Sequence, residues 1–207
     1  MRRDEFAVMN DKELAELLHD ISYGVLGTWG DDGWPELTPL NYVYHGGAIY
    51  FHGSRAGQKM RNLKADARVT FSVSKEYAII PSYFQHDKLA CPATAYFKSV
   101  IIKGYGEIVD NLEEKADALG AFMRKLQPEG GYAPITPADA DYEGQLKATS
   151  VVRIRIEQMT GKYKFGQNLK SEAHDRVAAQ LEERGLELDA ETAELMRRYC
   201  PHHQGGN

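Results

Sequence analysis

The stretch YGVLGTWGDDGWPELTPLNYVYHGGAIYFH, residues 23–52, decides the fold of this chain. It holds three runs rich in β-branched and aromatic residues, separated by the turn signals Asp31-Asp32-Gly33 and His45-Gly46-Gly47. Connections this tight leave no room for a crossover helix, so the runs are predicted to pair as an antiparallel meander. The three predicted strands cover residues 23–29, 34–44 and 48–52.

The rest of the chain adds three strands and several helices to this meander. Alternating or fully apolar runs predict strands over residues 68–78, 95–109 and 149–159. Apolar residues at helical spacing predict helices over residues 11–20, 57–65, 112–126, 138–147, 171–184 and 190–199. Six sequential strands, mostly antiparallel, are typical of a small barrel, so the fold is predicted to be mainly β with flanking helices.

Length and composition restrict the classes of protein to which the chain can belong. Its 207 residues suit one domain over residues 1–170, with residues 171–207 as a helical extension packed on it. A net charge of -5 gives no general attraction to nucleic acid or anionic lipid. No segment has the roughly 20 apolar residues of a membrane span, and the N-terminus does not resemble a signal peptide. A cytoplasmic protein is predicted.

The segment HGSRAGQKMRNLK, residues 52–64, is the part of the sequence that indicates chemistry. It has four Lys or Arg residues and no acidic residue in an otherwise acidic chain. It leaves a strand, passes two glycines and enters a helix, whose N-terminus favours anions. Arg55 can bind two phosphate oxygens, and Lys59 adds a point charge. These features indicate a phosphate site, while a solvated basic helix face explains the charges alone about equally well.

Other candidate motifs carry less information. The chain has no GxxxxGK[ST] loop, and Gly104-Tyr105-Gly106 lies inside a predicted strand, where a barrel bend is a better explanation than a dinucleotide loop. Cys91 and Cys200 form no CxxC pair, which favours a reducing compartment over a disulfide framework. Cys200, His202 and His203 are metal-ligating types but lie in a frayed terminus, of which residues 202–207 are predicted to be disordered, so no metal site is predicted.

Seven short segments resemble, in order and spacing, the pyridoxamine-phosphate-oxidase-like flavoproteins, and among them the nitroimidazole-resistance branch. They are residues 23–28, 30–35, 39–44, 49–53, 57–59, 96–101 and 156–162. The resemblance covers about residues 1–170. It implies a six-stranded antiparallel split β-barrel that binds FMN, and a homodimer with FMN at the subunit interface.

The same resemblance implies a set of cofactor-binding residues. Residues 36–41 match the strand along the isoalloxazine ring, which assigns to the ring Thr38, Pro39, Leu40 and Asn41. The strand end near the ribityl chain and phosphate is matched by Phe51, His52 and Gly53. The phosphate grip is matched by Arg55 and Lys59, and a polar residue near the ring by Ser99. Residues 162–168 resemble an element of related flavin-binding regulators, in which Gln167 and Asn168 would reach the flavin of the partner subunit.

Two positions, Glu36 and Asn41, separate the chain from the family's oxidase. A third position, His52, suggests catalysis. The oxidase has an arginine and a lysine where this chain has Glu36 and Asn41, so oxidation of pyridoxamine phosphate is not expected. His52 matches a histidine that the nitroimidazole-resistance proteins hold beside the ligand pocket. It is predicted to be catalytic, as a proton donor or an orienting group; a structural histidine at a strand end is the alternative.

The predicted function is an FMN-dependent oxidoreductase that passes electrons from a nicotinamide to a small acceptor, with nitroaromatics as candidates. The alternative is a flavin- or haem-binding sensor or storage protein without robust turnover. His52, together with the polar loop that holds His86 and Cys91, leaves haem open. The physiological acceptor stays open, as does the choice between nicotinamide and deazaflavin as donor.

Overall fold

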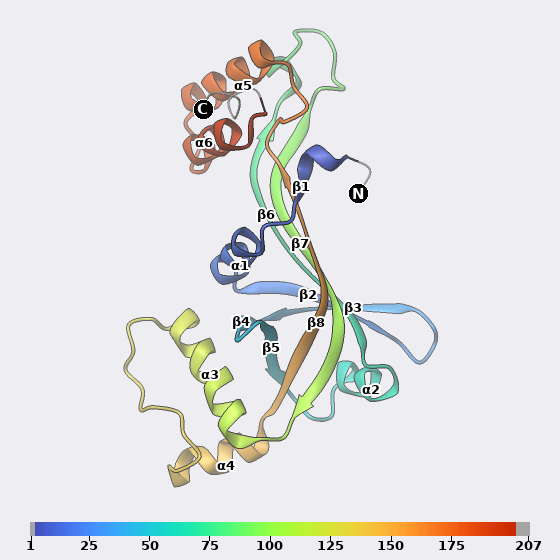
Figure 1. The fold of residues 1–207 in the computed structure, drawn as a ribbon, viewed down its shortest axis with the longest axis vertical. Helices are drawn as coiled ribbons and strands as arrows, with labels where there is room; N and C mark the ends of the chain where they lie inside the picture. The colour runs from blue at the N-terminus through green and yellow to red at the C-terminus, as the bar shows by residue number, and fades with distance from the viewer. Residues whose placement is uncertain (1–2, 202–207) are drawn as a thin grey trace. The chain divides into compact units, whose positions relative to one another are not determined.

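The computed structural model describes residues 3–201 (Figure 1). In chain order the elements are η1 (Asp4–Phe6), β1 (Ala7–Val8), α1 (Asp11–Asp20), β2 (Tyr23–Trp29), β3 (Pro35–Asn41), β4 (Val43–His45), β5 (Ala48–Gly53), α2 (Gln58–Ala65), β6 (Arg68–Ile80), η2 (Ser82–Phe84), β7 (Thr94–Val109), α3 (Leu112–Leu126), α4 (Ala140–Ala148), β8 (Ser150–Lys164), α5 (Ser171–Arg184) and α6 (Asp189–Tyr199). Every predicted strand and helix is present. The described residues form eight strands rather than six, because the predicted strand 34–44 divides into β3 and β4 and because the two-residue β1 is added.

The strands form one antiparallel sheet in the order β3-β2-β6-β7-β8-β5-β4, with β1 paired to β8. β3 and β4 lie at opposite ends of this order, yet only Tyr42 separates them in the chain. The sheet must therefore curl until its two edges meet at this residue. Tyr42 is fully buried, and its hydroxyl donates a hydrogen bond to the Leu18 carbonyl oxygen at 3.0 Å. The fold is the predicted split β-barrel with flanking helices.

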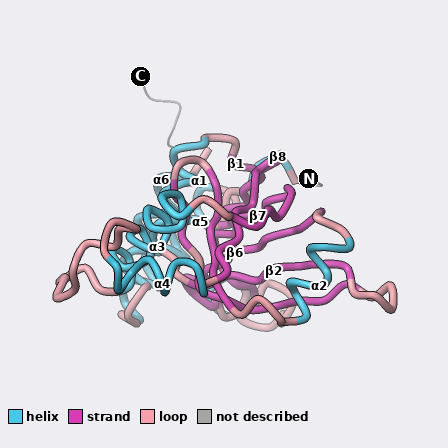
Figure 2. Tube along the Cα trace, turned by 90° about the horizontal axis from the view of Figure 1, so that it is seen from below, coloured by secondary structure: helices cyan, strands magenta, loops and turns pink. Residues whose placement is uncertain are grey.

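The described chain divides into two compact units, and the first comprises residues 10–73 and 100–160. In this unit the helix α3 buries Ala118 and Phe122 against Val43 and Tyr50 of the sheet. Asn111 caps the helix by accepting a hydrogen bond from the Glu114 amide at 2.9 Å. Figure 2 shows α2 lying beside β2 in the same unit.

Two lysines of α3 bind the C-terminal ends of neighbouring helices. Lys125 Nζ donates to the carbonyl oxygens of Leu18, at 2.9 Å, and Ile21, at 2.6 Å, where α1 ends. Burial lowers the pKa of Lys125 to about 8, against the opposing charge of Asp20. Lys115 makes the equivalent pair of bonds at the end of α4. Both lysines satisfy carbonyl groups that have no partner inside their own helix.

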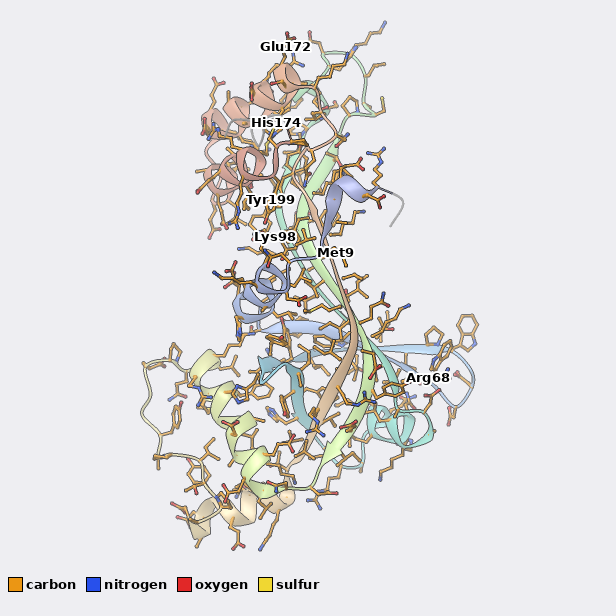
Figure 3. All side chains as sticks on the ribbon, in the orientation of Figure 1. Met9, Arg68, Lys98, Glu172, His174 and Tyr199 are labelled. Carbon is orange, nitrogen blue, oxygen red and sulfur yellow. The ribbon has the colours of Figure 1, made fainter. Side chains whose placement is uncertain are left out.

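The second unit comprises residues 3–9, 74–99 and 161–201 of the described chain. Its core includes an aromatic cluster in which the rings of Phe165 and Tyr199 stack at 5.7 Å and Tyr77 meets Phe165 edge-on at 5.3 Å. Tyr199, labelled in Figure 3, belongs to α6, so this cluster joins the terminal helix to the end of β8. The arginine Arg184 holds the α5–α6 connection through two hydrogen bonds to Asp189.

Four sequence predictions are only partly covered by these observations. The helices α5 and α6 lie in the same unit as the end of β8, but the domain boundary at residue 170 stays a prediction. His202 and His203 lie outside the described residues, whereas Cys200 is buried. Within residues 3–201 no group of metal-ligating side chains is found. The helices of that same range include none with the length and apolar character to cross a membrane.

Candidate functional site

The basic segment predicted from the sequence forms the connection between β5 and α2. β5 ends at Gly53, and α2 begins at Gln58 with Gly57 at its N-cap. The first turn of α2 has no acidic residue of its own, and the N-terminus of a helix is the positive end of its dipole. The loop between them is braced by a hydrogen bond from the Ala56 amide to Ser54 Oγ at 3.3 Å.

Lys59 lies over the end of β5. A methyl group placed on Gly53 would come within 3.1 Å of Lys59 Nζ, so the ammonium lies close to the backbone of this glycine. The same ammonium acts on the neighbouring His52. Partial burial of the imidazole ring, and then the charge of Lys59, lower the pKa of His52 below its ordinary value of 6.5. Its ring is exposed at one side and meets Phe122 edge-on at 4.8 Å.

A polar cluster that the sequence did not reveal fixes α2 to the strand predicted to run along the flavin. Glu36 of β3 accepts a hydrogen bond from Gln58 Nε2 and another from Asn62 Nδ2 at 3.0 Å. Asn62 is buried and also bonds Thr28 Oγ1 of β2 at 3.0 Å. The start of α2 is therefore held at a fixed position relative to β3. Glu36 therefore has a structural role in this unit.

The other predicted residues of this unit have varied environments. β3 is the edge strand of the sheet, and it exposes Pro39 and Asn41 while Thr38 and Leu40 are half-buried. Asn41 Nδ2 donates to the Ser22 carbonyl oxygen at 3.1 Å. Phe51 is fully buried in the core, so only its backbone is available to a ligand. Arg55 is exposed, and it lines a hollow together with Lys115 of α3 and Ser150, the sheet partner of Gly53.

Ser99, Gln167 and Asn168 belong to the second unit. Ser99 Oγ donates to the Lys162 carbonyl oxygen at 3.4 Å. The side-chain amide of Gln167 is buried, accepting from the Phe165 amide and donating to the Tyr163 carbonyl oxygen, both at 2.7 Å. These bonds use both ends of the amide to hold the turn at Gly166, where φ is +81°. Asn168 is exposed.

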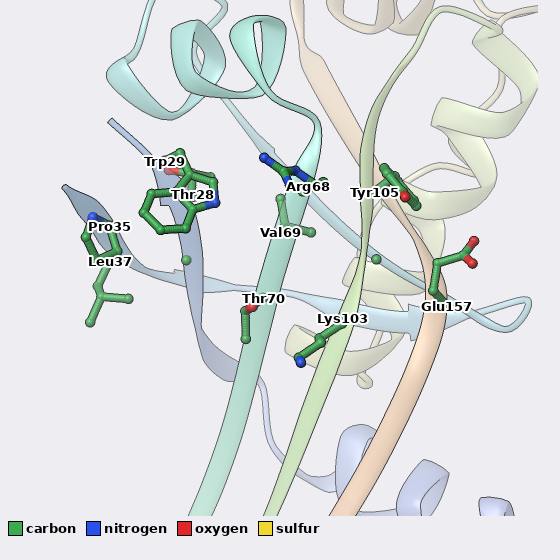
Figure 4. Close-up of a pocket in the computed structure, with 12 residues that line it drawn as sticks. Thr28, Trp29, Pro35, Leu37, Arg68, Val69, Thr70, Lys103, Tyr105 and Glu157 are labelled. Carbon is green, nitrogen blue, oxygen red and sulfur yellow. The ribbon is translucent and has the colours of Figure 1, made fainter. Parts of the chain in front are cut away.

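A hollow of the first unit lies on the face of the sheet that exposes Trp29, Leu37 and Tyr105, and it involves none of the predicted site residues. It has a volume of about 490 Å³ and spans β2, β3, β6, β7 and β8 (Figure 4). Trp29, Leu37 and Tyr105 line it with 48%, 71% and 38% of their surfaces exposed. Arg68, Lys103 and Glu157 add charge around this apolar lining.

Comparison with known families identifies the fold's relatives. Residues 10–163 match the family model described as pyridoxamine 5'-phosphate oxidase. The chain belongs to this family. The match covers β2 to β8, including the β5–α2 loop, and confirms the family predicted from the short segments of the sequence.

Solved structures with the same fold include proteins described by flavin or drug-resistance functions. A protein described as a 5-nitroimidazole antibiotic resistance protein, from Bacteroides thetaiotaomicron, is 20% identical with a TM-score of 0.63, over 75% of this chain and 85% of that one. A flavocytochrome from Azotobacter vinelandii is 23% identical with a TM-score of 0.64, over 77% and 69%. An FAD- and heme-binding protein from Mycobacterium smegmatis is 19% identical with a TM-score of 0.64, over 84% and 80%. No curated protein matches the sequence significantly.

Proposed function

We propose that this member of the pyridoxamine 5'-phosphate oxidase family is a flavin-dependent oxidoreductase that binds FMN at the β5–α2 loop. The observation that carries the proposal is the position of Lys59, whose ammonium rests over the bare backbone of Gly53 beside the positive end of α2. An ammonium, a glycine-permitted close approach and a helix N-terminus together fit a phosphate monoester. Structures of the same fold include the flavocytochrome and the FAD- and heme-binding protein.

The chain's own residues would bind and orient the cofactor, whereas the flavin supplies the hydride chemistry. Lys59 and Arg55 would hold the phosphate. The hydrogen bond between Glu36 and Asn62 holds α2 in place beside β3, where the residues Thr38–Asn41 would lie along the ring. His52, beside Lys59, would donate a proton to the acceptor. A nicotinamide donor and a nitroaromatic acceptor are the proposed substrates. Ser99 is proposed as a polar residue near a flavin ring, and Gln167 and Asn168 would reach the flavin of the partner subunit.

The FMN-loaded chain should oxidise NADPH or NADH when a nitroaromatic is present, and not when it is absent. Steady-state loss of nicotinamide absorbance measures this, after desalting has shown that the flavin absorption bands stay with the protein. A chain that keeps the flavin but gives no acceptor-dependent oxidation would be a sensor or storage protein. A chain that keeps haem, or nothing, would contradict the assignment of FMN.

Replacing Lys59 by alanine should weaken FMN binding by about ten- to a hundredfold while leaving riboflavin binding nearly unchanged. The physical reason is that a charge-assisted hydrogen bond contributes about 1.5–3 kcal/mol, and only FMN has the phosphate to receive it. Fluorescence titration of both flavins on both chains gives the comparison. Arg61→Ala, on an exposed position of the same helix, is the charge-matched control. Equal losses for FMN and riboflavin would remove Lys59 from the phosphate site.

We further propose a homodimer that covers the flavin and buries the sheet face that exposes Trp29, Leu37 and Tyr105. These side chains present apolar surface around one hollow, and contiguous apolar patches of this kind often mark association sites. Light scattering should give about twice the chain mass of 23.2 kDa. Leu37→Glu should shift the protein toward monomer by placing a charge on the patch, whereas Leu126→Glu, on α3, should not. A monomeric wild-type chain with tightly bound FMN would rule the shared interface out.

A further inference from the structure

A hollow of about 280 Å³ lies between the end of α1, the strand β4 and the last turns of α3, all within the first unit. Both helices pack against β4. None of the residues predicted for the flavin site lines this hollow. It lies at the β4–β5 hairpin, and the predicted phosphate loop follows the opposite end of β5, about 16 Å away along the strand. A ligand bound here would be separate from the flavin phosphate. We call this space the Arg124 hollow.

Part of the lining of the Arg124 hollow is aliphatic and part is aromatic. Val43 is buried and Ala121 is half-buried. The ring of Tyr44 meets the ring of His19 edge-on, with the centroids 5.4 Å apart. Such side chains offer surface that a flat apolar group can cover. A cavity of about 150 Å³ can hold benzene, so the Arg124 hollow has room for one aromatic ring with a small substituent.

Two cations complete the lining, and they differ in what already stabilises their charge. Lys125 Nζ donates to two carbonyl oxygens at the end of α1, and its ammonium lies 4.5 Å from the centre of the Tyr42 ring. Arg124 is exposed, and it makes no hydrogen bond or ion pair with any residue of the described range 3–201. The guanidinium of Arg124 is therefore the cation of the hollow that is left to bind an anion.

The carboxylates near the hollow are already engaged, and within the described part of the chain none belongs to its lining. Burial lowers the pKa of Lys125 to about 8, and the Asp20 carboxylate opposes this effect. Asp117 Oδ2 lies 2.7 Å from His45 Nε2. The charge without a partner in the hollow is thus that of one arginine, which matches a monoanion better than a phosphate dianion.

We propose that the Arg124 hollow binds an aromatic monocarboxylate, whose ring lies against Tyr44 and Ala121 and whose carboxylate is bound by Arg124. A guanidinium can hold both oxygens of a carboxylate through two parallel N–H···O bonds. Lys125 adds electrostatic attraction while it keeps its bonds to the end of α1. The proposal does not rest on the proposed flavin function, because the two sites share no residue.

Titration of benzoate into the isotope-labelled chain, with and without added FMN, tests the proposal through the chemical shifts of backbone amides. The signals of Val43, Tyr44 and residues 121–125 should move and saturate together. Benzoate should bind more tightly than acetate, which lacks the ring, and more tightly than benzyl alcohol, which lacks the charge. Arg124→Gln should weaken benzoate binding by about ten- to a hundredfold. Arg61→Gln, at an exposed arginine of α2, should leave it unchanged.

Ala121→Leu gives an independent test, because a larger side chain fills the hollow and leaves every charge in place. It should abolish benzoate binding, and Arg124→Gln decides the question if Ala121→Leu does not fold. The proposal is wrong if Arg124→Gln and Arg61→Gln bind benzoate alike, if acetate or benzyl alcohol binds as tightly as benzoate, or if the wild type binds none. Benzoate that FMN displaces would also overturn it, by placing the acid at the flavin site, while leaving the proposed flavin function intact.

Discussion

Replacing Gly104 by alanine should destabilise the fold by about 3 kcal/mol or more, at the upper end of the penalty for overfilling a packed interior. Gly104 lies in β7, and β8 is its neighbour in the sheet. A Cβ at this position would lie 2.1 Å from the Arg155 carbonyl oxygen and 3.2 Å from Ile154 Cγ2. The first of these atoms belongs to the backbone, so the clash can be relieved only by moving one strand away from the other. Against a typical stability of about 5–15 kcal/mol, that loss is large.

Urea denaturation would measure the effect as a lower midpoint with an unchanged slope. Alanine substitutions at two other glycines give reference values for this loss of stability. Gly106→Ala should cost less, because its nearest neighbour at 2.6 Å is Leu63 Cδ2, the end of a flexible side chain. Gly144→Ala, in α4 with nothing within 4 Å of the new methyl, should raise stability by about 0.5–1 kcal/mol. Equal midpoints for Gly104→Ala and Gly144→Ala would contradict the close strand approach.

Gly104 also shows why much of the fold could be predicted from the sequence. Its position inside a predicted strand argued against a nucleotide loop, and Gly104 does lie within β7, close to the backbone of Arg155 in β8. Strands and helices follow from local patterns of apolar residues, so α3 and α5 begin and end where predicted. The break at Tyr42 has no local signal. Residues on both sides favour strand, and the break arises because closing the sheet makes β3 and β4 pair with different partners.

The candidate site was predictable only where its residues form a pattern. The basic segment around Lys59 is conspicuous because four cations and two glycines fall between a strand and a helix. Asn62 and Glu36 gave no such signal, since each is a single polar residue whose partner lies far away in the chain. Lys115 was equally hidden. A lysine on an amphipathic helix is usually exposed, and only the tertiary structure reveals that this one is buried.

Some site residues that the family resemblance implied make hydrogen bonds within the fold that could not be predicted from the sequence. Gln167 was assigned to the flavin, but both ends of its amide are engaged with the backbone around Gly166. A contact between Gln167 and a flavin stays a prediction that would require exchanging these bonds. Asn168 is the next residue and is exposed, so a contact with a flavin would not require exchanging buried hydrogen bonds. A resemblance therefore locates a segment more reliably than it identifies which side chain of the segment is available.

His52→Ala should lower the turnover of the FMN-loaded chain by about 10²–10⁴-fold, the usual contribution of a positioned proton donor. FMN affinity should change little, because Lys59 and Arg55 are proposed to hold the phosphate. His45→Ala, at a half-buried histidine that pairs with Asp117 in the same unit, is the matched control and should keep normal turnover. Flavin content, single-turnover rates and thermal unfolding should be measured on both variants.

The pH dependence separates a catalytic His52 from a structural one. Partial burial and the charge of Lys59 hold the pKa of His52 in the folded chain below 6.5. The protonated imidazole, which is the proton donor, is therefore populated only in more acidic solution. Turnover should therefore rise as the pH falls through this lowered pKa, and His52→Ala should lack that rise. Stability should move the opposite way: the unfolded chain takes up the proton first, so the wild type loses stability as the pH falls below 6.5, and His52→Ala loses less. Normal turnover with a lower melting temperature would make His52 a packing partner of Phe122, and joint loss of FMN and activity would make it an orienting residue only.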